Sequence, residues 1–237
     1  MRIGIPIYDN FDALDVIGAY QVFKVSGMQP ILLAQSMCAV RSWEDVQMIP
    51  HYSFDNTDSL DVLFVPGGTH LGDVLGLLGP DQNPLLAFIR RMAKGNKRCK
   101  PKLITSVCTG ALFLAAAGQL DGYHATTHWN YKPVLALFPK VKVLPGFPRW
   151  HQDRNRITGG GISSTIDEAL FITSRLLGAS AAKCAQLTIQ YAPGPPFRDG
   201  DPLEASPRIL KQVRADMEDP ATTAAFQAWI AKWGGSI

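Results

Sequence analysis

Short apolar runs alternate with longer amphipathic stretches along the first half of the chain. The apolar runs, each predicted to form a buried strand, are Ile3–Tyr8, Pro30–Gln35, Asp61–Gly68 and Lys102–Val107. Apolar residues recur at helical spacing over Asp12–Lys24, over Pro84–Lys94 and in a segment that ends near Gly118. Strands that alternate with helices of about ten to fifteen residues predict a parallel sheet with helices on both faces.

The second half of the chain continues this pattern. Strands are expected at Ala125–Trp129 and Arg156–Thr158, and helices at Ser163–Leu177, Ala181–Tyr191, around Pro207–Met217 and around Ala221–Trp233. Residues 192–202 contain too many prolines and glycines for either element. We therefore predict an α/β fold of the doubly wound, mostly parallel class over residues 1–191. Residues 192–237 would form a strap and C-terminal helices packed on the same domain.

Composition narrows the choice of partners. Only 18% of the 237 residues are charged, against about 25% in an average soluble domain, which suggests a surface partly covered by a partner. The net charge of +3 is too small to argue for nucleic-acid binding. The apolar run Ala111–Ala117 has seven residues, whereas a membrane span needs about 20. Asp9 interrupts the N-terminus before a signal-peptide core can form, so a cytoplasmic protein without a membrane partner is expected.

Cys108 occupies the most informative position. It ends an apolar predicted strand in TSVCTGALFLAAAG (residues 105–118), and a helix begins directly after it. At such a strand-to-helix elbow, the following N–H groups and the helix dipole point at the side chain. They stabilise a thiolate, the nucleophilic form of cysteine. We predict a nucleophile; the alternative is a buried structural cysteine.

The other three cysteines lack this position. Cys38 and Cys184 are expected to be packing residues, and Cys99 lies among five basic residues in a predicted solvated turn. No CxxC pair is present, which argues against zinc and thioredoxin-like sites. The histidines His51, His70, His124 and His151 have no mutual spacing that suggests a metal site. No metal or cofactor is expected.

Asp15 is the acid–base candidate. It lies one helical turn after Asp12, a predicted N-cap, and its spacing to Gly18 and Val22 turns it toward the core. A partly buried carboxyl has a raised pKa and can hold or exchange a proton. His128, at the end of a predicted strand, can reach the same site or can be a hydrogen-bonded core histidine.

Two glycine clusters follow predicted strands. Gly67 and Gly68 would place free backbone N–H groups beside the elbow as an oxyanion site, although Gly68 can equally be a structural turn residue. The GGG of residues 159–161 allows close backbone approach, with Ser163 or Ser164 capping the next helix. Neither cluster is a GxGxxG fingerprint and no P-loop is present, so a nucleotide has little support.

Together these segments resemble the PfpI/ThiJ superfamily of flavodoxin-like cysteine proteins, and in particular its isonitrile hydratase branch. The motifs that carry the resemblance are FDALDVIGAYQVF from residue 11, VPGG from 65, TSVCTGALFLAAAG from 105, LDGYHATTHW from 120, ITGGGISSTID from 157 and YAPGPPFRDGDP from 191.

The resemblance implies roles for the matching residues. Cys108 would be the nucleophile, Asp15 would hydrogen-bond it and handle its proton, and Gly68 would supply a backbone donor. Thr109 would contribute its N–H to the anion site and its hydroxyl beside the sulfur. Peptidase-like members place a histidine directly after the cysteine, so Thr109 counts against proteolysis. The implied activity is cofactor-free hydration of a small isonitrile to an N-substituted formamide, in a homodimer.

The chain also departs from the hydratase pattern. Ile17 and Ala19 replace a threonine and a proline, and Gln21 stands where many members hold a glutamate. Ser164 and Thr165 replace an alanine and a glycine. The apolar neighbourhood of Ile17 suits a small hydrophobic substrate, and the departures leave the substrate open.

Two other functions are retained as alternatives. One is a glyoxalase-like or thiol-stress enzyme on the same scaffold. The other is a ligand-sensing regulatory module, although only about 30 residues follow the strap, too few for a double helix-turn-helix. For the homodimer, the apolar C-terminal residues Phe226, Trp229, Ile230 and Trp233 are the expected surface.

Overall fold

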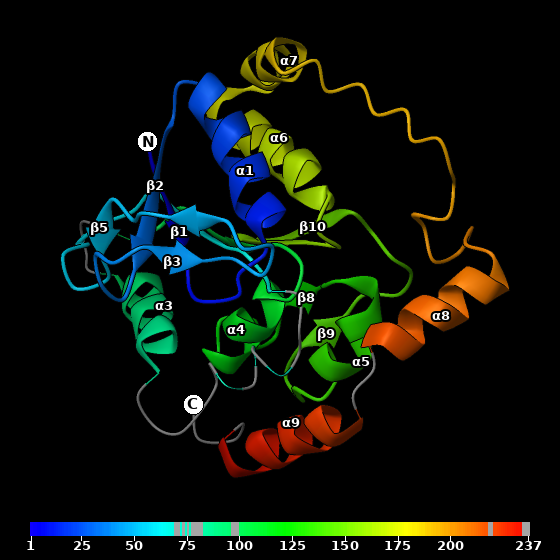
Figure 1. Ribbon diagram of the computed structural model, residues 1–237. Coiled ribbons are helices and arrows are strands. Elements are labelled where there is room, and N and C mark those ends of the chain that lie inside the picture. Colours follow the sequence, from blue (N-terminus) through cyan, green and yellow to red (C-terminus); the bar gives the residue numbers. More distant parts are fainter. Residues whose placement is uncertain are drawn as a thin grey trace.

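A central sheet of seven strands organises the protein (Figure 1). The computed structural model describes residues 1–68, 83–95, 100–217 and 220–233, together with residues 72, 74 and 76. The strands of the sheet are β1 (Arg2–Pro6), β2 (Gln29–Ala34), β5 (Tyr52–Ser53), β6 (Val62–Val65), β7 (Leu103–Ser106), β10 (Trp150–Asp153) and β11 (Arg156–Gly159). Their spatial order is β10-β11-β7-β6-β1-β2-β5, and all neighbours run parallel except β10 and β11.

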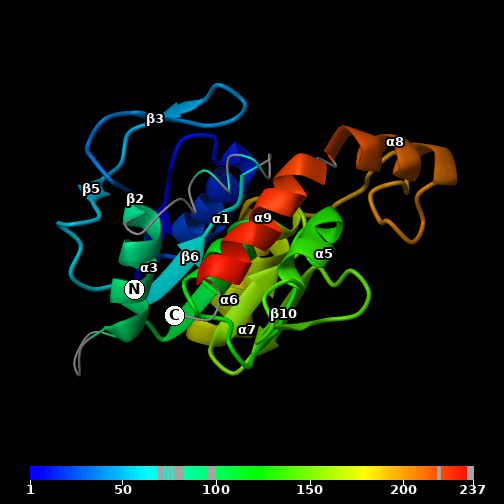
Figure 2. The ribbon, with the colours of Figure 1, turned by 90° about the horizontal axis from the view of Figure 1, so that it is seen from below.

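Helices cover both faces of the sheet, which confirms the predicted α/β, flavodoxin-like class (Figures 1 and 2). One face carries α1 (Ala13–Val25), α6 (Ser164–Leu177) and α7 (Ala179–Thr188). The other face carries α3 (Pro84–Lys94) and α4 (Gly110–Ala116), with α5 (Lys132–Leu135) beside α4. The remaining helices are α8 (Pro207–Met217), set to one side, and α9 (Pro220–Trp233), which lies across the α4 side.

The central strands of the sheet are almost completely buried. Every residue of β6 and β7 is buried, and β1 is buried from Ile3 onward. Such continuous apolar runs are typical of parallel strands covered on both faces. Because the carboxyl ends of β1, β6, β7 and β11 point the same way, the loops that follow them meet at one edge of the sheet.

The predicted strand Ala125–Trp129 is wrong. Only His124 and Ala125 are extended, as β8 (His124–Ala125), and they pair with β9 (Lys142–Val143) outside the main sheet. The next two residues are held by hydrogen bonds to or from side chains instead of strand pairing. The Thr126 N–H donates to Thr158 Oγ1 at 2.9 Å, and the Thr127 hydroxyl donates to the Cys108 carbonyl at 2.7 Å. A 3₁₀ turn, η1 (Trp129–Tyr131), follows.

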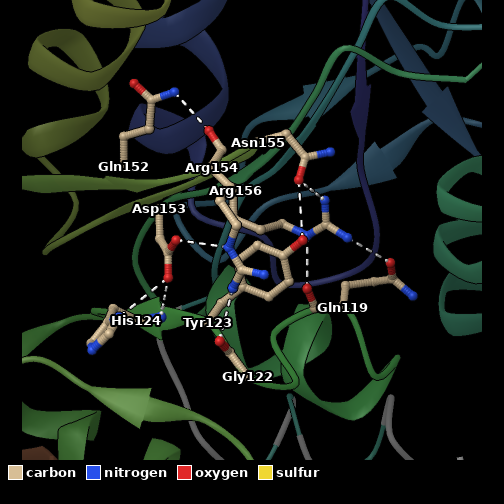
Figure 3. Close-up of polar contacts among 9 residues, drawn as sticks. All are labelled: Gln119, Gly122, Tyr123, His124, Gln152, Asp153, Arg154, Asn155 and Arg156. Carbon is tan, nitrogen blue, oxygen red and sulfur yellow. Dashed lines mark hydrogen bonds and ion pairs between the residues drawn. The ribbon is translucent and has the colours of Figure 1, made fainter.

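Three further short strands and β10 were not predicted from the apolar pattern, because they are polar or only two residues long. The short ones are β5, β3 (Val40–Arg41) and β4 (Gln47–Met48). In β10, WHQD carries no apolar alternation. Its hairpin with β11 is held instead by polar contacts (Figure 3): Arg154 and Arg156 both lie over the Tyr123 ring, at 3.5 and 4.8 Å from its centroid, and Asp153 accepts a hydrogen bond from the His124 N–H.

The C-terminal apolar residues pack on their own chain. Phe226 is fully buried, and the rings of Phe226 and Trp229 each lie 6.5 Å from that of Phe138. Ile230 also packs against the core, whereas the side chain of Trp233 lies outside the described residues. Phe226, Trp229 and Ile230 therefore do not form the exposed partner surface expected from the sequence. Residues 192–200 of the strap are exposed and run away from the sheet (Figure 1).

Candidate active site

Cys108 lies at a strand-to-helix elbow, as predicted. It has a φ of 53°, in the left-handed region, between the end of β7 and the start of α4. Its N–H donates to the Gly160 carbonyl at 2.8 Å, and its own carbonyl accepts from Thr127. Gly110 permits this sharp turn, because a Cβ at that position would overlap the Val65 carbonyl of β6.

Asp15 lies in the same buried region, on α1. Its side chain is fully buried, and Oδ2 accepts a hydrogen bond from the Gly67 N–H at 2.7 Å. Asp12 is the N-cap of α1, as predicted, and accepts from the N–H of Leu14 and Asp15 at 3.0 and 3.3 Å. Gly67 also touches the nucleophile: a Cβ there would lie 2.9 Å from that of Cys108. The VPGG turn thus joins Asp15 to Cys108.

Tight packing between α1 and α6 fixes Asp15 from the other side. Thr165 Oγ1 on α6 donates to the Asp15 carbonyl at 2.8 Å. Gly18 allows this approach, since a Cβ at Gly18 would lie 2.5 Å from Thr165 Cγ2. The Gly18 position predicted to face inward is therefore the point of contact between the two helices.

The predicted thiolate form of Cys108 is not what the surroundings favour. Burial raises the pKa of the thiol well above its ordinary value, and the charges of Asp15 and Asp12 raise it further. Hydrogen bonds from the backbone and side chain of Thr109 lower that pKa but do not outweigh burial. The cost of enclosing a charge away from water thus outweighs the stabilisation that the start of α4 gives to a thiolate.

Burial likewise favours the neutral form of Asp15. Removal from water raises the pKa of its carboxyl well above the ordinary range, the Asp12 charge adds to this rise, and the Gly67 hydrogen bond opposes it. The surroundings thus favour the neutral forms of both the Cys108 thiol and the Asp15 carboxyl. Because the charge of Asp15 acts on Cys108, a proton taken up by one group changes the ease with which the other ionises.

The predicted free backbone donors are engaged within the protein. The Gly67 N–H binds Asp15, and the Gly68 N–H donates to Thr109 Oγ1 at 2.8 Å, while that hydroxyl also lies 2.8 Å from the Gly68 carbonyl. Gly68 in addition forms an isolated antiparallel bridge with Phe11. The Thr109 hydroxyl thus ties the VPGG turn to the elbow, and the Gly68 N–H is not free as expected.

His128 and Ile17 have different surroundings. His128 is 8% exposed, burial lowers its pKa to about 4, and a Cβ at Gly161 would lie 3.0 Å from its Cδ2. It accepts a hydrogen bond from the Asn130 N–H as the N-cap of η1, rather than ending a strand. Ile17 is 48% exposed on α1, so its side chain contacts solvent rather than a closed apolar pocket.

Two buried residues of this region were missed by sequence reasoning. Tyr131 lies with its ring centroid 5.6 Å from that of His128, and burial together with the charge of Cys108 raises its pKa to about 12. Glu168 is fully buried on α6. The helical spacing from Thr165 through Glu168 to Ile172, all on the buried face, was the available signal.

The remaining sequence expectations have mixed outcomes. Cys38 and Cys184 are exposed, so the prediction that they pack in the core is wrong, and Cys99 and His70 lie outside the described residues. Ser163 is the N-cap residue of α6, but its side chain makes no capping hydrogen bond. In the described part of the chain, no group of three or more His, Cys, Asp or Glu side chains can hold a metal ion, and none of its helices is long and apolar enough to span a membrane.

Comparison with known proteins identifies relatives that span most of the chain. Isonitrile hydratase of Pseudomonas putida is 35% identical over 215 residues, 90% of this chain and 89% of that protein. A crystal structure of a ThiJ/PfpI family protein from Pseudomonas syringae is 31% identical, with a TM-score of 0.84 over 96% of this chain and 89% of that one. The transcriptional regulator GbdR of Pseudomonas aeruginosa is 26% identical over 73% of this chain, which spans only 46% of the regulator. The DJ-1/PfpI family model matches residues 1–175, and the chain belongs to this family.

Proposed function

We propose that the protein is a cofactor-free hydratase that adds water to an isonitrile and releases an N-substituted formamide. The observation that carries this proposal is a buried cysteine at an elbow beside a buried carboxyl whose charge acts on it. The similarity to an isonitrile hydratase over 90% of the chain supports the substrate class.

In the first step, the neutral pair adds across the terminal carbon of the isonitrile. Asp15 gives its proton to that carbon and takes the Cys108 proton, while the sulfur forms a bond to the same carbon. The product is a neutral thioimidate, Cys108–S–CH=N–R, and Asp15 is protonated again. Because no net charge develops, this step suits a site in which burial opposes ionisation of both groups.

In the second step, water adds to the thioimidate carbon and the nitrogen gains a proton, which gives a tetrahedral carbon bearing S, OH and NHR. The C–S bond then breaks, the hydroxyl proton returns to sulfur through Asp15, and the formamide leaves. Cys108 and Asp15 finish in their starting forms. The Thr109 N–H, which already stabilises negative charge on the sulfur, would stabilise the departing thiolate.

The test is release of formamide from a small aliphatic isonitrile by the purified protein. Turnover is expected for the unaltered chain and is expected to disappear in Cys108→Ala, whereas Cys184→Ala, which removes an exposed thiol, keeps it. Unchanged turnover in Cys108→Ala would overturn the mechanism. A dicarbonyl assay run in parallel separates the hydratase from a glyoxalase-like enzyme.

The second candidate function is ligand sensing without turnover, which the similarity to the regulator GbdR favours. In that case a small molecule would bind at the elbow and remain unchanged. Binding of an isonitrile, followed by tryptophan fluorescence, together with complete absence of formamide would select this candidate over the hydratase.

The hydratase is further proposed to act in the cytoplasm as a homodimer. Exposed apolar side chains on α1, Leu14 at 44% and Ile17 at 48%, and on the strap, Phe197 and Leu203 at 75% each, support self-association. Light scattering after size exclusion should give twice the chain mass. The double variant Leu14→Ser/Ile17→Ser should shift toward the monomer if α1 is in the interface.

A further inference from the structure

Glu168 is a buried acid for which the hydration mechanism gives no role. It lies on α6 with 0% exposure, and neither carboxyl oxygen has a hydrogen-bond partner in the part of the chain that the structure describes. An isolated buried carboxylate is strongly disfavoured, and even a neutral buried acid loses free energy without a partner. A side chain retained at this position needs a reason beyond packing.

The position of the carboxyl connects it to the elbow. It lies directly over Gly159, where a Cβ would overlap Oε2 and would lie 3.3 Å from Cδ. The same Cβ would lie 3.0 Å from Val107, the residue before Cys108. Gly160, which follows Gly159, accepts the Cys108 N–H. Glu168 therefore packs against the backbone segment that binds Cys108.

Asp15 is the charged group that acts on Glu168. Burial raises the pKa of Glu168 well above its ordinary range, and the charge of Asp15 raises it further. Oδ1 of Asp15 has no hydrogen-bond partner among the described residues either. Geometry supports this link, because Thr165, three residues before Glu168 on the buried face of α6, donates a hydrogen bond to the Asp15 carbonyl at 2.8 Å. Two carboxyls close together in a dry interior cannot readily both ionise.

The other charged side chains on the elements packed against α6 are either exposed or paired with other groups. Lys24 on α1 and Lys183 on α7 are exposed. On β10, Asp153 forms ion pairs with Arg154 and His124, and on β11, Arg156 donates hydrogen bonds to Gln119. His151 on β10 has its ring near that of His124. Burial and, after it, the like charge of Asp15 are therefore the two effects that raise the pKa of Glu168.

We propose that Glu168 is a positioning residue that forms a buried acid pair with Asp15, and that this pair carries at most one negative charge while the site works. The neutral acid beside Asp15 lets Asp15 release its proton to the substrate without placing two carboxylates behind Cys108. This role rests on the proposed hydratase function, and Glu168 would influence the reaction of the substrate only through Asp15.

The test is the pH dependence of Cys108 alkylation by iodoacetamide, which needs no isonitrile turnover. Peptide mass spectrometry follows Cys108 separately, because Cys38 and Cys184 are exposed and also react. In Glu168→Gln, the rate of Cys108 alkylation should equal that of the unaltered chain at mildly acidic pH. At alkaline pH it should be higher by about threefold or more, which corresponds to a decrease of about half a unit in the pKa of the thiol. The second carboxylate that opposes the thiolate is then missing.

Two further variants make the result decisive. Glu168→Asp retains an acid and should keep the pH dependence of the unaltered chain, and Glu204→Gln, at an exposed position, should change nothing. A constant rate ratio across pH in Glu168→Gln, whether equal to one or raised by loosened packing, would overturn the proposal.

If isonitrile turnover is observed, Glu168→Gln should also move the alkaline limb of kcat to lower pH and leave KM unchanged, because Asp15 then loses its proton without a neighbouring carboxylate to oppose the charge. If neither the unaltered chain nor the variants turn over an isonitrile but alkylation of Cys108 shows the expected pH dependence, the hydratase proposal is contradicted and the acid pair is not. An alkaline limb that stays in place would contradict the pair.

Discussion

At the scale of single residues, enclosure rather than charge attraction determines the chemistry of the site. Cys108 is 2% exposed, and Asp15 and Glu168 are fully buried. An isolated charge in such surroundings costs several kcal/mol, so burial favours the neutral form of each of the three groups. The Asp15 carboxyl accepts a hydrogen bond from a backbone N–H, and the Cys108 thiol has hydrogen bonds from the backbone and the side chain of Thr109.

Asp15→Asn tests the proton transfer at this scale. The amide oxygen can still accept from the Gly67 N–H, so the fold should persist, but the acidic proton is lost. We expect kcat for isonitrile hydration to fall about 10²–10⁴-fold with little change in KM. Asp121→Asn, at a residue paired with Lys140, is the matched control and should retain full activity.

Thr109→Val tests the link between the elbow and the VPGG turn. The substitution keeps the shape but leaves the Gly68 N–H and carbonyl without the hydroxyl they both contact. The free energy of unfolding should fall by about 1–3 kcal/mol, as measured by urea denaturation. Thr109→Ser keeps the hydroxyl and should lose much less; equal losses in the two variants would refute this role.

Much of this site could be predicted from the residue pattern. Cys108 was located by the change from a strand to a helix, and Asp15 by its helical spacing. The protonation states could not be predicted, because burial of Cys108 depends on segments far away in the sequence, such as the turn at Gly67. The engagement of the Gly68 N–H by Thr109 likewise depends on a contact 41 residues apart.

At the scale of elements, the contact between α1 and α6 is the main determinant of where Asp15 lies. The helices approach so closely at Gly18 that Thr165 reaches the Asp15 carbonyl. The strands and long helices were predicted because each carries a continuous or periodic apolar pattern. The edge strand β10 was not predicted, and the strand predicted over Ala125–Trp129 ends at Ala125, because polar side chains and tertiary hydrogen bonds hold these segments.

Gly18→Ala tests this helix contact. The added methyl group would lie 2.5 Å from Thr165 Cγ2, so the helices must separate, and the free energy of unfolding should fall by about 1–3 kcal/mol. Gly194→Ala, at a strap position with nothing within 4 Å of the added methyl group, is the control. Adding Thr165→Ser to Gly18→Ala removes Cγ2 and should restore stability; no recovery would argue against the clash.

At the scale of the whole molecule, the buried acids couple folding to pH. Folded pKa values of Asp15 and Glu168 lie above their ordinary values of 3.8 and 4.5, so the folded state binds more protons than the unfolded state. Their contribution is fully present below those ordinary values and is lost as pH rises through the folded pKa values. His128 has the opposite sign, since its pKa is lowered from 6.5 to about 4, but its slope becomes small above about pH 7.5, where the unfolded imidazole is almost fully neutral.

Stability measured above about pH 7.5 should therefore fall with rising pH. The decrease is up to about 1.4 kcal/mol per pH unit for each acid that is still protonated in the folded state and ionised in the unfolded state. Urea denaturation between about pH 7.5 and 8.5 measures it. Glu168→Gln should flatten the decrease, and a variant slope as steep as that of the unaltered chain would contradict the assignment of Glu168 as a buried proton-binding group.

The covalent bond between Cys108 and the isonitrile carbon is the centre of the proposed mechanism, and intact-protein mass spectrometry after rapid acid quenching tests it most directly. We expect a transient species heavier than the chain by the mass of one isonitrile, mapped to Cys108 and absent in Cys108→Ala. Formamide release from the unaltered chain without such a species under single-turnover conditions, or an adduct confined to Cys38 or Cys184, would contradict the mechanism.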